Sequence, residues 1–423
     1  MDLECRFETL SPELLIGIAT RLPDLESLDN LLRASPAAFR LFDTYGLEIF
    51  EAVLSSGLTH EFTCTIIRIV ALVRSSALPP QVHDLWSFRS FIRHETTVYR
   101  YDPPEWESVP IHMPLDTSAT VLRGLLAINR KIVCLTIDCL RYYLDRFKPL
   151  RPSHLVDKSF IFVSEWRRGE YLPSWRLKPA ETPYPVRDIG PPSWVEEQRV
   201  LRAFWRVALF DQLRITVNAS LISWPESSVK KLNMMDVVNF YWVSPFNLLS
   251  PNELEPNIPL SQQRQALEEE LLQSVSYYAT ENRETINSST FLQTRRDWPL
   301  RTPSQEDWEV VGCHTSWTYT FFYHVSQPDD YVEEGHCTPL QQISFQPFRC
   351  LGFAIWDTER MTEYGLLDPS HSHADDSYLL AWRSVLGKEE MAQAERFMME
   401  LDDEYWSDFA IVDYIPSPMA TDM

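Results

Sequence analysis

The first organised stretch of this chain reads Leu10-Ser11-Pro12-Glu13-Leu14-Leu15-Ile16-Gly17-Ile18, and it continues through Leu22-Pro23-Asp24-Leu25 and Leu28 to Leu31-Leu32-Arg33-Ala34-Ser35-Pro36. Ser11 suits a helix cap, and Pro12 suits the first helical position because the N–H that it lacks needs no partner there. Leucine and isoleucine then recur every four residues, which predicts one apolar helix face. We expect this helix to begin at Pro12 and to end before Pro23.

Two further short helices are expected directly after it. The second carries an apolar stripe and closes at Ala34-Ser35-Pro36, and the third spans the aromatic segment that follows. The residues of these two stripes are Leu25, Leu28, Leu31 and Leu32, then Phe39, Phe42, Leu47, Ile49 and Phe50. Three helices in so short a segment are marginal alone, which favours completion by the rest of the chain or by a partner. Such stripes are also typical of the first layer of a protein's own core.

The order of residues in this opening resembles the F-box, with leucine, proline and glutamate at the start, an Asp-Leu turn, and a second leucine-rich helix ending in Ala-Ser-Pro. It looks most like the F-box-like domain of an uncharacterised family of filamentous-fungal proteins. The resemblance covers residues 6–50. Ser11 stands where that family commonly has the first proline of a Leu-Pro pair. Two later stretches, Glu197–Arg206 and Leu351–Arg360 with Tyr364–Asp368, are similar to motifs of the same family.

The resemblance implies a three-helix domain that docks onto the Skp-type linker subunit of a cullin ubiquitin ligase. The remainder of the chain would then hold a substrate protein, which the sequence does not identify. The helix spacing allows seven residues to share the linker-binding surface, namely Leu10, Pro12, Leu14, Ile18, Leu22, Leu28 and Leu31. Such an interface is apolar, and a few of its leucines carry most of the binding energy.

Composition and charge agree with a globular binding protein. The chain has 423 residues, 44% of them hydrophobic, and a net charge of −22, with 38 basic against 60 acidic side chains. The stretch from Lys388 to Met423 alone has ten acids against two bases. Nucleic acids and anionic membranes are poor partners for such a chain because both need a cationic surface.

The expected location is the cytoplasm or the nucleus. The sequence starts Met-Asp-Leu-Glu-Cys without a basic stretch before an apolar run, and no window has 18 uninterrupted apolar residues. Its 7 scattered cysteines fit reduced thiols rather than a disulfide framework.

The pattern along the chain predicts a mainly α fold, with an irregular helical domain after the F-box-like unit. We divide it into an F-box-like domain (1–55), a helical segment (56–148), a Pro/Trp-rich extended segment (149–193), a helical C-terminal domain (194–410) and a flexible acidic tail (411–423). Helices are expected at 60–75, 84–94, 194–217, 227–240 and 261–280, and 115–147 is expected to form one long helix or a broken pair. The alternating aromatics between Trp308 and Trp356, above all 317–323, allow a small β-hairpin and are a weak candidate for a recognition surface.

Nothing in the sequence predicts catalysis, a cofactor or a metal. Neither phosphate-binding glycine motif nor a Gly-x-Ser-x-Gly elbow occurs. The nearest metal-like groupings are Cys313-His314, His336-Cys337 with Cys350, and His371-Ser372-His373 with Asp375 and Asp376. Adjacent strand residues point to opposite faces, so each Cys-His pair supplies at most one ligand, and ordinary buried thiols and imidazoles explain them better. Cys134 and Cys139 are predicted to be packing residues of one helix.

Three hypotheses remain open from the sequence. The first is the F-box-like substrate receptor. The second is a non-enzymatic helical scaffold or regulatory protein whose degenerate F-box forms part of its own core, and an enzyme of unrecognised type is the least favoured third. They differ in surface: the first predicts that Leu14, Ile18 and Leu22 form an exposed apolar patch, and the second predicts that they are buried against Ile66 or Val70.

Overall fold

The structure is a computed structural model that describes residues 6–96, 113–160, 165–167, 170–172, 176–241, 260–287, 296–298, 303–304, 307, 340, 343–367 and 376–410. The predicted mainly α fold is confirmed. The chain divides into two compact units that interleave along the sequence. Unit 1 comprises Met1–Lys148, Gly190–Ser316 and Arg349–Asp357, and unit 2 comprises Pro149–Ile189, Trp317–Phe348 and Thr358–Met423.

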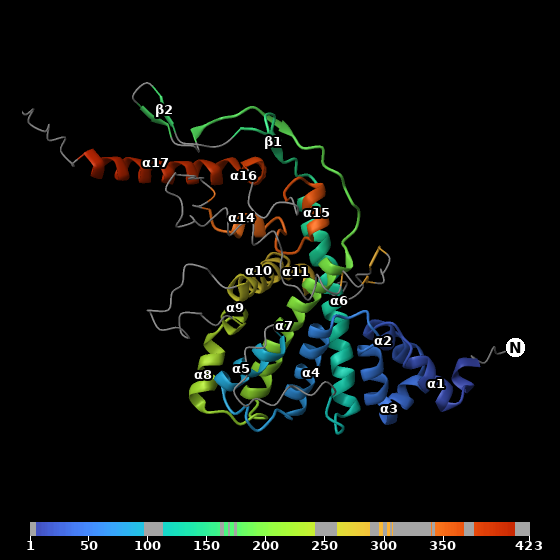
Figure 1. The fold of residues 1–423 in the computed structure, drawn as a ribbon. Helices are drawn as coiled ribbons and strands as arrows, with labels where there is room; N and C mark the ends of the chain where they lie inside the picture. Colours follow the sequence, from blue (N-terminus) through green and yellow to red (C-terminus); the bar gives the residue numbers. More distant parts are fainter. Residues whose placement is uncertain are drawn as a thin grey trace, which may run out of the picture. The chain divides into compact units, whose positions relative to one another are not determined.

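The helices of unit 1 lie close to the predicted ranges (Figure 1). After a 3-10 turn at Arg6–Thr9 they are α1 (Pro12–Ala19), α2 (Leu25–Ala34), α3 (Pro36–Leu54), α4 (Glu61–Ser75), α5 (Leu85–Thr96), α6 (Ala119–Phe147), α7 (Trp194–Asn218), α8 (Glu226–Met234), α9 (Val237–Tyr241), α10 (Leu260–Glu281) and α11 (Arg283–Ile286). The stretch predicted as one long helix or a broken pair is the single 29-residue helix α6.

Pro12 and two side-chain caps mark where the first three helices begin. Ser11 lies at the N-cap of α1 with Pro12 at the first position, as predicted, although the Ser11 side chain bonds none of the free amides. The Asp24 carboxylate accepts a 2.7 Å hydrogen bond from the Ser27 N–H and starts α2. The Ser35 hydroxyl accepts one of 3.1 Å from the Ala38 N–H and starts α3. These three helices form the N-terminal helical module, residues 8–54.

The helix predicted over 227–240 is divided in two, which corrects that prediction. Helix α8 stops at Met234 because Met235 is extended, with φ −82° and ψ 147°. A new helix then starts because the Asp236 carboxylate accepts a 2.7 Å hydrogen bond from the Asn239 N–H. Asp236 is therefore a helix cap in the middle of an apolar pattern that looked continuous.

The core of unit 1 is built around α7, which packs on α4, α6 and α10. All thirteen residues from Trp194 to Arg206 are buried, so the helix has no solvent face over that length. Two of its buried polar side chains are paired internally: the Gln198 side-chain oxygen accepts a 3.0 Å hydrogen bond from the His60 N–H, and Glu197 pairs with Arg296. Burial raises the pKa of the Glu197 carboxyl, and the neighbouring Arg296 opposes that rise.

Unit 2 combines short strands with helices. Strand β1 (Ser153–Leu155) pairs antiparallel with β4 (Glu181–Pro183), and β2 (Glu165–Arg167) pairs with β3 (Glu170–Leu172). The helices are α14 (Gln346–Arg349), whose last residue belongs to unit 1, α15 (Thr358–Glu363), α16 (Asp376–Ser384) and α17 (Lys388–Ala410). Leu155 of β1 packs with Leu380 of α16.

The strands of the described residues lie in the Pro/Trp-rich segment, which the sequence predicted only as extended. Pro183 fits there because a two-stranded sheet leaves each strand an edge where a missing N–H costs nothing. The hairpin predicted between Trp308 and Trp356 falls mostly on residues outside the described ranges, as do the aromatics at 317–323 and the tail 411–423. Residues 343–356, which are described, contain no strand.

Candidate functional site

Helix α1 carries apolar side chains on two faces about 100° apart, one buried and one exposed. Leu15 and Ala19 point into the module and are 5% and 3% exposed. Leu14 and Ile18, one turn apart on the second face, are 58% and 40% exposed. A helix of a self-contained module would bury its apolar residues on one stripe only. Leu14 and Ile18 are therefore available to a partner.

The other residues predicted for the linker-binding surface differ in exposure. Pro12 is exposed, and Leu10, Leu22 and Leu31 are half-buried. Leu28 is completely buried, so its placement on the surface was wrong. Helix α2 has two turns in which Leu25, Leu28 and Leu32 share one stripe, and that stripe is the inner face of the module.

The sequence did not predict which side of the module packs against the rest of unit 1. Residues Ile66 and Val70 of α4, the expected burial site for α1 in the scaffold hypothesis, are completely buried, and α4 packs on α7, α6 and α5. The module itself is joined to α6 through α2 and α3. Gly46 makes this approach close, since a Cβ there would lie 3.3 Å from a Leu122 methyl group.

Charged side chains reinforce the joint between the module and α6. Asp29 of α2 pairs with Arg130 at 3.2 Å, and Asp43 of α3 pairs with Arg123. The Arg123 guanidinium also lies over the Phe39 ring, 4.3 Å from its centroid, an attractive cation–π geometry. Phe39, expected in the apolar stripe of the third helix, is 42% exposed instead. No local pattern predicts these partners, because they lie about 80 to 100 residues apart in the sequence.

Hydrogen bonds order the start of the module. The Glu8 carboxylate accepts a hydrogen bond from the Ser35 hydroxyl and another, of 2.9 Å, from the Ala37 N–H. It thereby occupies the N-terminus of α3, where a negative charge is favourable. At the start of α1, hydrogen bonds from its own amide and from the Ser11 hydroxyl keep the pKa of Glu13 below its ordinary value. Glu13 is thus a charged neighbour of the exposed Leu14.

Residues 197–206 and 351–357, the parts of the two later motifs that belong to unit 1, lie together in its core. Arg199, from the motif Glu197–Arg206, donates from one guanidinium nitrogen to the carbonyl oxygens of Ile355 at 3.0 Å and Trp356 at 2.7 Å. Glu196 of the same helix accepts a 3.1 Å hydrogen bond from the Asp357 N–H. Ile355 and Trp356 are completely buried. In unit 1, residues 197–206 and 351–357 therefore hold the fold together rather than line an open site.

The candidate metal and nucleophile residues give no site in the described part of the chain. Among those residues, no three His, Cys, Asp or Glu side chains are grouped closely enough to hold a metal ion. Cys350 is half-buried, whereas Cys313-His314, His336-Cys337 and His371–Asp375 lie outside the described ranges. Cys134 and Cys139 are both buried thiols on α6, which agrees with their predicted packing role.

Cys64 should be almost inert toward alkylation in the folded protein. Burial raises the pKa of its thiol to about 12, and its Sγ donates a 3.3 Å hydrogen bond to the Leu54 carbonyl. Only the thiolate reacts, so its fraction at pH 8 is about a thousandfold lower than that of an ordinary thiol. Iodoacetamide labelling followed by peptide mass spectrometry should modify the half-buried Cys350 first and Cys64 only after addition of urea. Labelling of both at equal rates without urea would contradict this expectation.

Comparisons with other proteins leave the resemblance as a sequence-based expectation. No family model matches the chain, and no curated protein or solved structure is significantly similar to it. In the described part of the chain, no helix is both long and apolar enough to span a bilayer.

Proposed function

We propose that this protein is a substrate-receptor subunit of a cullin-type ubiquitin ligase, and that its N-terminal helical module docks onto the Skp-type linker subunit. The proposal rests chiefly on one observation, the outward exposure of Leu14 and Ile18 on a helix that already packs into the module through Leu15 and Ala19. The order of residues in the module, which resembles the F-box, supplies the identity of the partner. The protein would act by binding, in the cytoplasm or the nucleus, with no catalysis of its own.

The exposed residues suit the centre of such an interface. Leu14 and Ile18 are four residues apart and therefore neighbours on the helix surface. Burying both against a partner removes two large apolar side chains from water, and each fully buried side chain of this size stabilises a complex by about 1.5–3 kcal/mol. Pro12 and the half-buried Leu10, Leu22 and Leu31 would surround them, whereas Leu28 stabilises the module from inside.

The attachment of the module to α6 favours a substrate receptor over a module that is joined to the chain only by a flexible linker. The pairs Asp29–Arg130 and Asp43–Arg123 fix α2 and α3 on α6, which is itself part of the core of unit 1. A substrate held elsewhere on unit 1 would then keep a defined position relative to the ligase. The substrate protein would be basic rather than acidic, since the chain carries a net charge of −22.

The test is capture of a purified Skp-type linker subunit from a filamentous fungus by the full-length chain. The Leu14→Asp, Ile18→Asp double variant should lose at least about 30-fold in affinity, because two central apolar contacts are replaced by charges that stay solvated. Both positions are exposed, so the melting temperature should change little.

A matched control uses two equally exposed apolar residues elsewhere. Ile215→Asp with Leu221→Asp changes side chains that are 59% and 62% exposed near the end of α7, and capture should remain at the wild-type level. Failure of the folded wild-type protein to bind the linker would overturn the proposal and favour the helical scaffold hypothesis. Equal loss of linker affinity in both double variants would show a nonspecific effect of charge and would also contradict the proposal.

A further inference from the structure

Gly17 lies inside α1, where a glycine is unfavourable. The helix has 8 residues, Pro12–Ala19. Glycine lowers the helix equilibrium about fivefold relative to alanine, because its backbone loses more conformational freedom on ordering. A helix this short is marginal by itself, so the loss matters. What glycine offers in return is that another group can come close to its backbone.

Nothing in the described part of the chain requires a glycine at position 17. Its φ is not among the positive values that favour glycine, unlike that of Gly57. A Cβ built on Gly17 would meet no neighbouring atom within 4 Å. Gly46 of α3 is different, because a Cβ there would lie 3.3 Å from the Phe42 ring and from a Leu122 methyl group. The space beside Gly17 is therefore open.

Gly17 lies among the exposed apolar side chains of α1. Leu14 is one turn before it and Ile18 is the next residue, and they are 58% and 40% exposed. The Arg21 N–H donates a 3.2 Å hydrogen bond to the Ile18 carbonyl, so the chain continues the spiral in a tighter turn after the helix. Residues 14, 17, 18 and 21 have the spacing of a hole that accepts one side chain from a facing helix. We call it the Gly17 hole.

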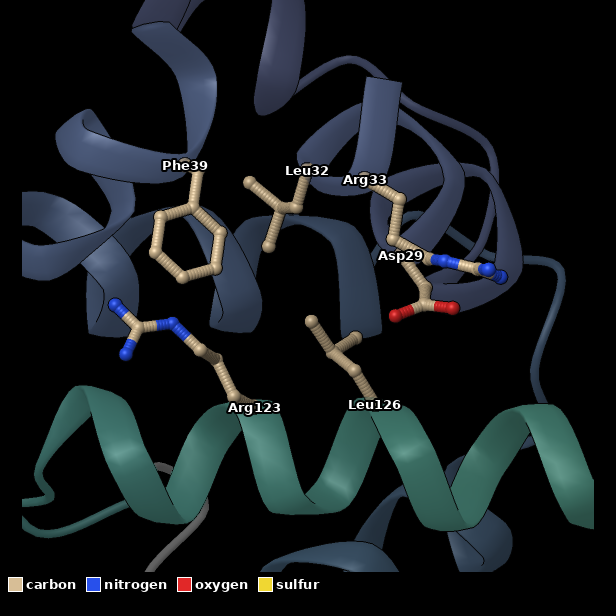
Figure 2. A pocket seen from close by; sticks show the side chains of 6 residues that line it. All are labelled: Asp29, Leu32, Arg33, Phe39, Arg123 and Leu126. Carbon is tan, nitrogen blue, oxygen red and sulfur yellow. The ribbon is translucent and has the colours of Figure 1, made fainter. Parts of the chain in front are cut away.

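The rest of unit 1 holds the module from another side. Helix α6 packs on α2 and α3, whereas α1 packs on α3. Figure 2 shows Leu32 of α2 facing Leu126 of α6, with the Arg123 guanidinium beside the Phe39 ring. Leu32 and Leu126 are 6% and 1% exposed, so the chain itself fills this joint. The Gly17 backbone has no such cover among the described residues.

We propose that the Gly17 hole receives one large apolar side chain, of leucine size or larger, from a helix of the linker subunit. The linker is the partner of the proposed function, on which this inference rests. The incoming side chain would contact Leu14 and Ile18 and lie directly on the Gly17 backbone. Leu14 and Ile18 alone would form a ridge that many apolar surfaces could cover. A hole with a glycine floor instead selects a partner with a projecting side chain at that position.

Gly17→Ala and Gly17→Leu should bind the purified linker subunit progressively more weakly. The alanine methyl group would occupy part of the hole and lower the affinity about fivefold, and leucine would fill it and lower the affinity at least about 50-fold. Stability should change in the opposite direction. Both variants of the full-length protein should melt about 1–2 °C higher without the linker, because both side chains favour helix and meet open space. Calorimetric titration and thermal unfolding measure the two effects.

Ala392→Leu is the matched control, because Ala392 is a small, exposed residue of α17, and its linker affinity should equal that of the wild type. If the wild type binds the linker and Gly17→Leu binds it equally well, this inference is overturned and the proposed function stands. If the folded wild type binds no linker, both are overturned.

Two other occupants of the hole would be revealed by the same variants. A lower melting temperature in Gly17→Leu would show that a segment of this chain covers Gly17. Self-association of the wild type that Gly17→Leu abolishes, measured by analytical ultracentrifugation, would show that a second copy occupies the hole. Either result would overturn the inference.

Discussion

Arg199→Met is expected to lower the free energy of unfolding of unit 1 by about 3–5 kcal/mol. The guanidinium of Arg199 is 3% exposed and donates to two backbone carbonyls, those of Ile355 and Trp356. Methionine fills most of the space of the stem but provides no donor. Two carbonyl groups that are buried with their residues would lose a charge-assisted hydrogen bond each, and water has no access to replace them.

Urea unfolding and hydrogen exchange would test this expectation. The unfolding midpoint should fall, and amides of 351–357 should exchange faster than in the wild type under native conditions, because that segment loses its anchor. Arg214→Met is the control on the same helix, since Arg214 is only half-buried and lies over the Phe210 ring at 5.3 Å. A midpoint shift in Arg199→Met no larger than in Arg214→Met would show that the carbonyl contacts contribute little.

Glu51→Ala is expected to cost about 3–5 kcal/mol as well. The Glu51 carboxylate accepts hydrogen bonds from Arg68 Nη2 at 2.7 Å and from the Met113 N–H at 2.6 Å. It thus ties α3 to α4 and to the segment before α6. Arg68 is 7% exposed, so removal of Glu51 leaves a guanidinium buried without its carboxylate.

The comparison of three variants would isolate this pair. Glu48 is exposed and lies one turn earlier on α3. Glu48→Ala should change the free energy of unfolding by less than about 0.5 kcal/mol. The double variant Glu51→Leu, Arg68→Met should recover part of the loss, because two apolar side chains of similar size need no charge partner. A double variant less stable than Glu51→Ala would show that packing, rather than the unpaired charge, causes the effect.

Local signals in the sequence were sufficient to place most helices. Pro12 starts α1 and Ala34-Ser35-Pro36 closes α2 as expected, because such signals act within three or four residues. The same holds for α4, α7 and α10, whose apolar patterns are long. The structure adds the caps Asp24 and Ser35, which start α2 and α3. The helix expected over 227–240 is interrupted before Asp236. The Asp236 side chain accepts a hydrogen bond from the backbone N–H three residues later and starts a new helix, although the apolar pattern continues through this position.

The candidate linker-binding site was only partly predictable. Apolar spacing shows which leucines share a helix face, but it does not show which face is already covered. Leu28 and Leu14 look equivalent in the sequence, yet Leu28 is buried in the module and Leu14 is exposed. Their difference depends on how α1, α2 and α3 pack on one another.

The sequence by itself determined the mainly α class and the start of the first helix at Pro12, because propensity and helix-start signals are local properties. The tertiary structure alone decided that Arg199 and Glu196 hold 355–357, that Asp29 and Asp43 anchor the module to α6, and that Leu14 and Ile18 remain outside. These contacts join residues up to about 160 positions apart. Only the packing of whole helices brings such residues together, since no pairwise signal between them is present in a single sequence.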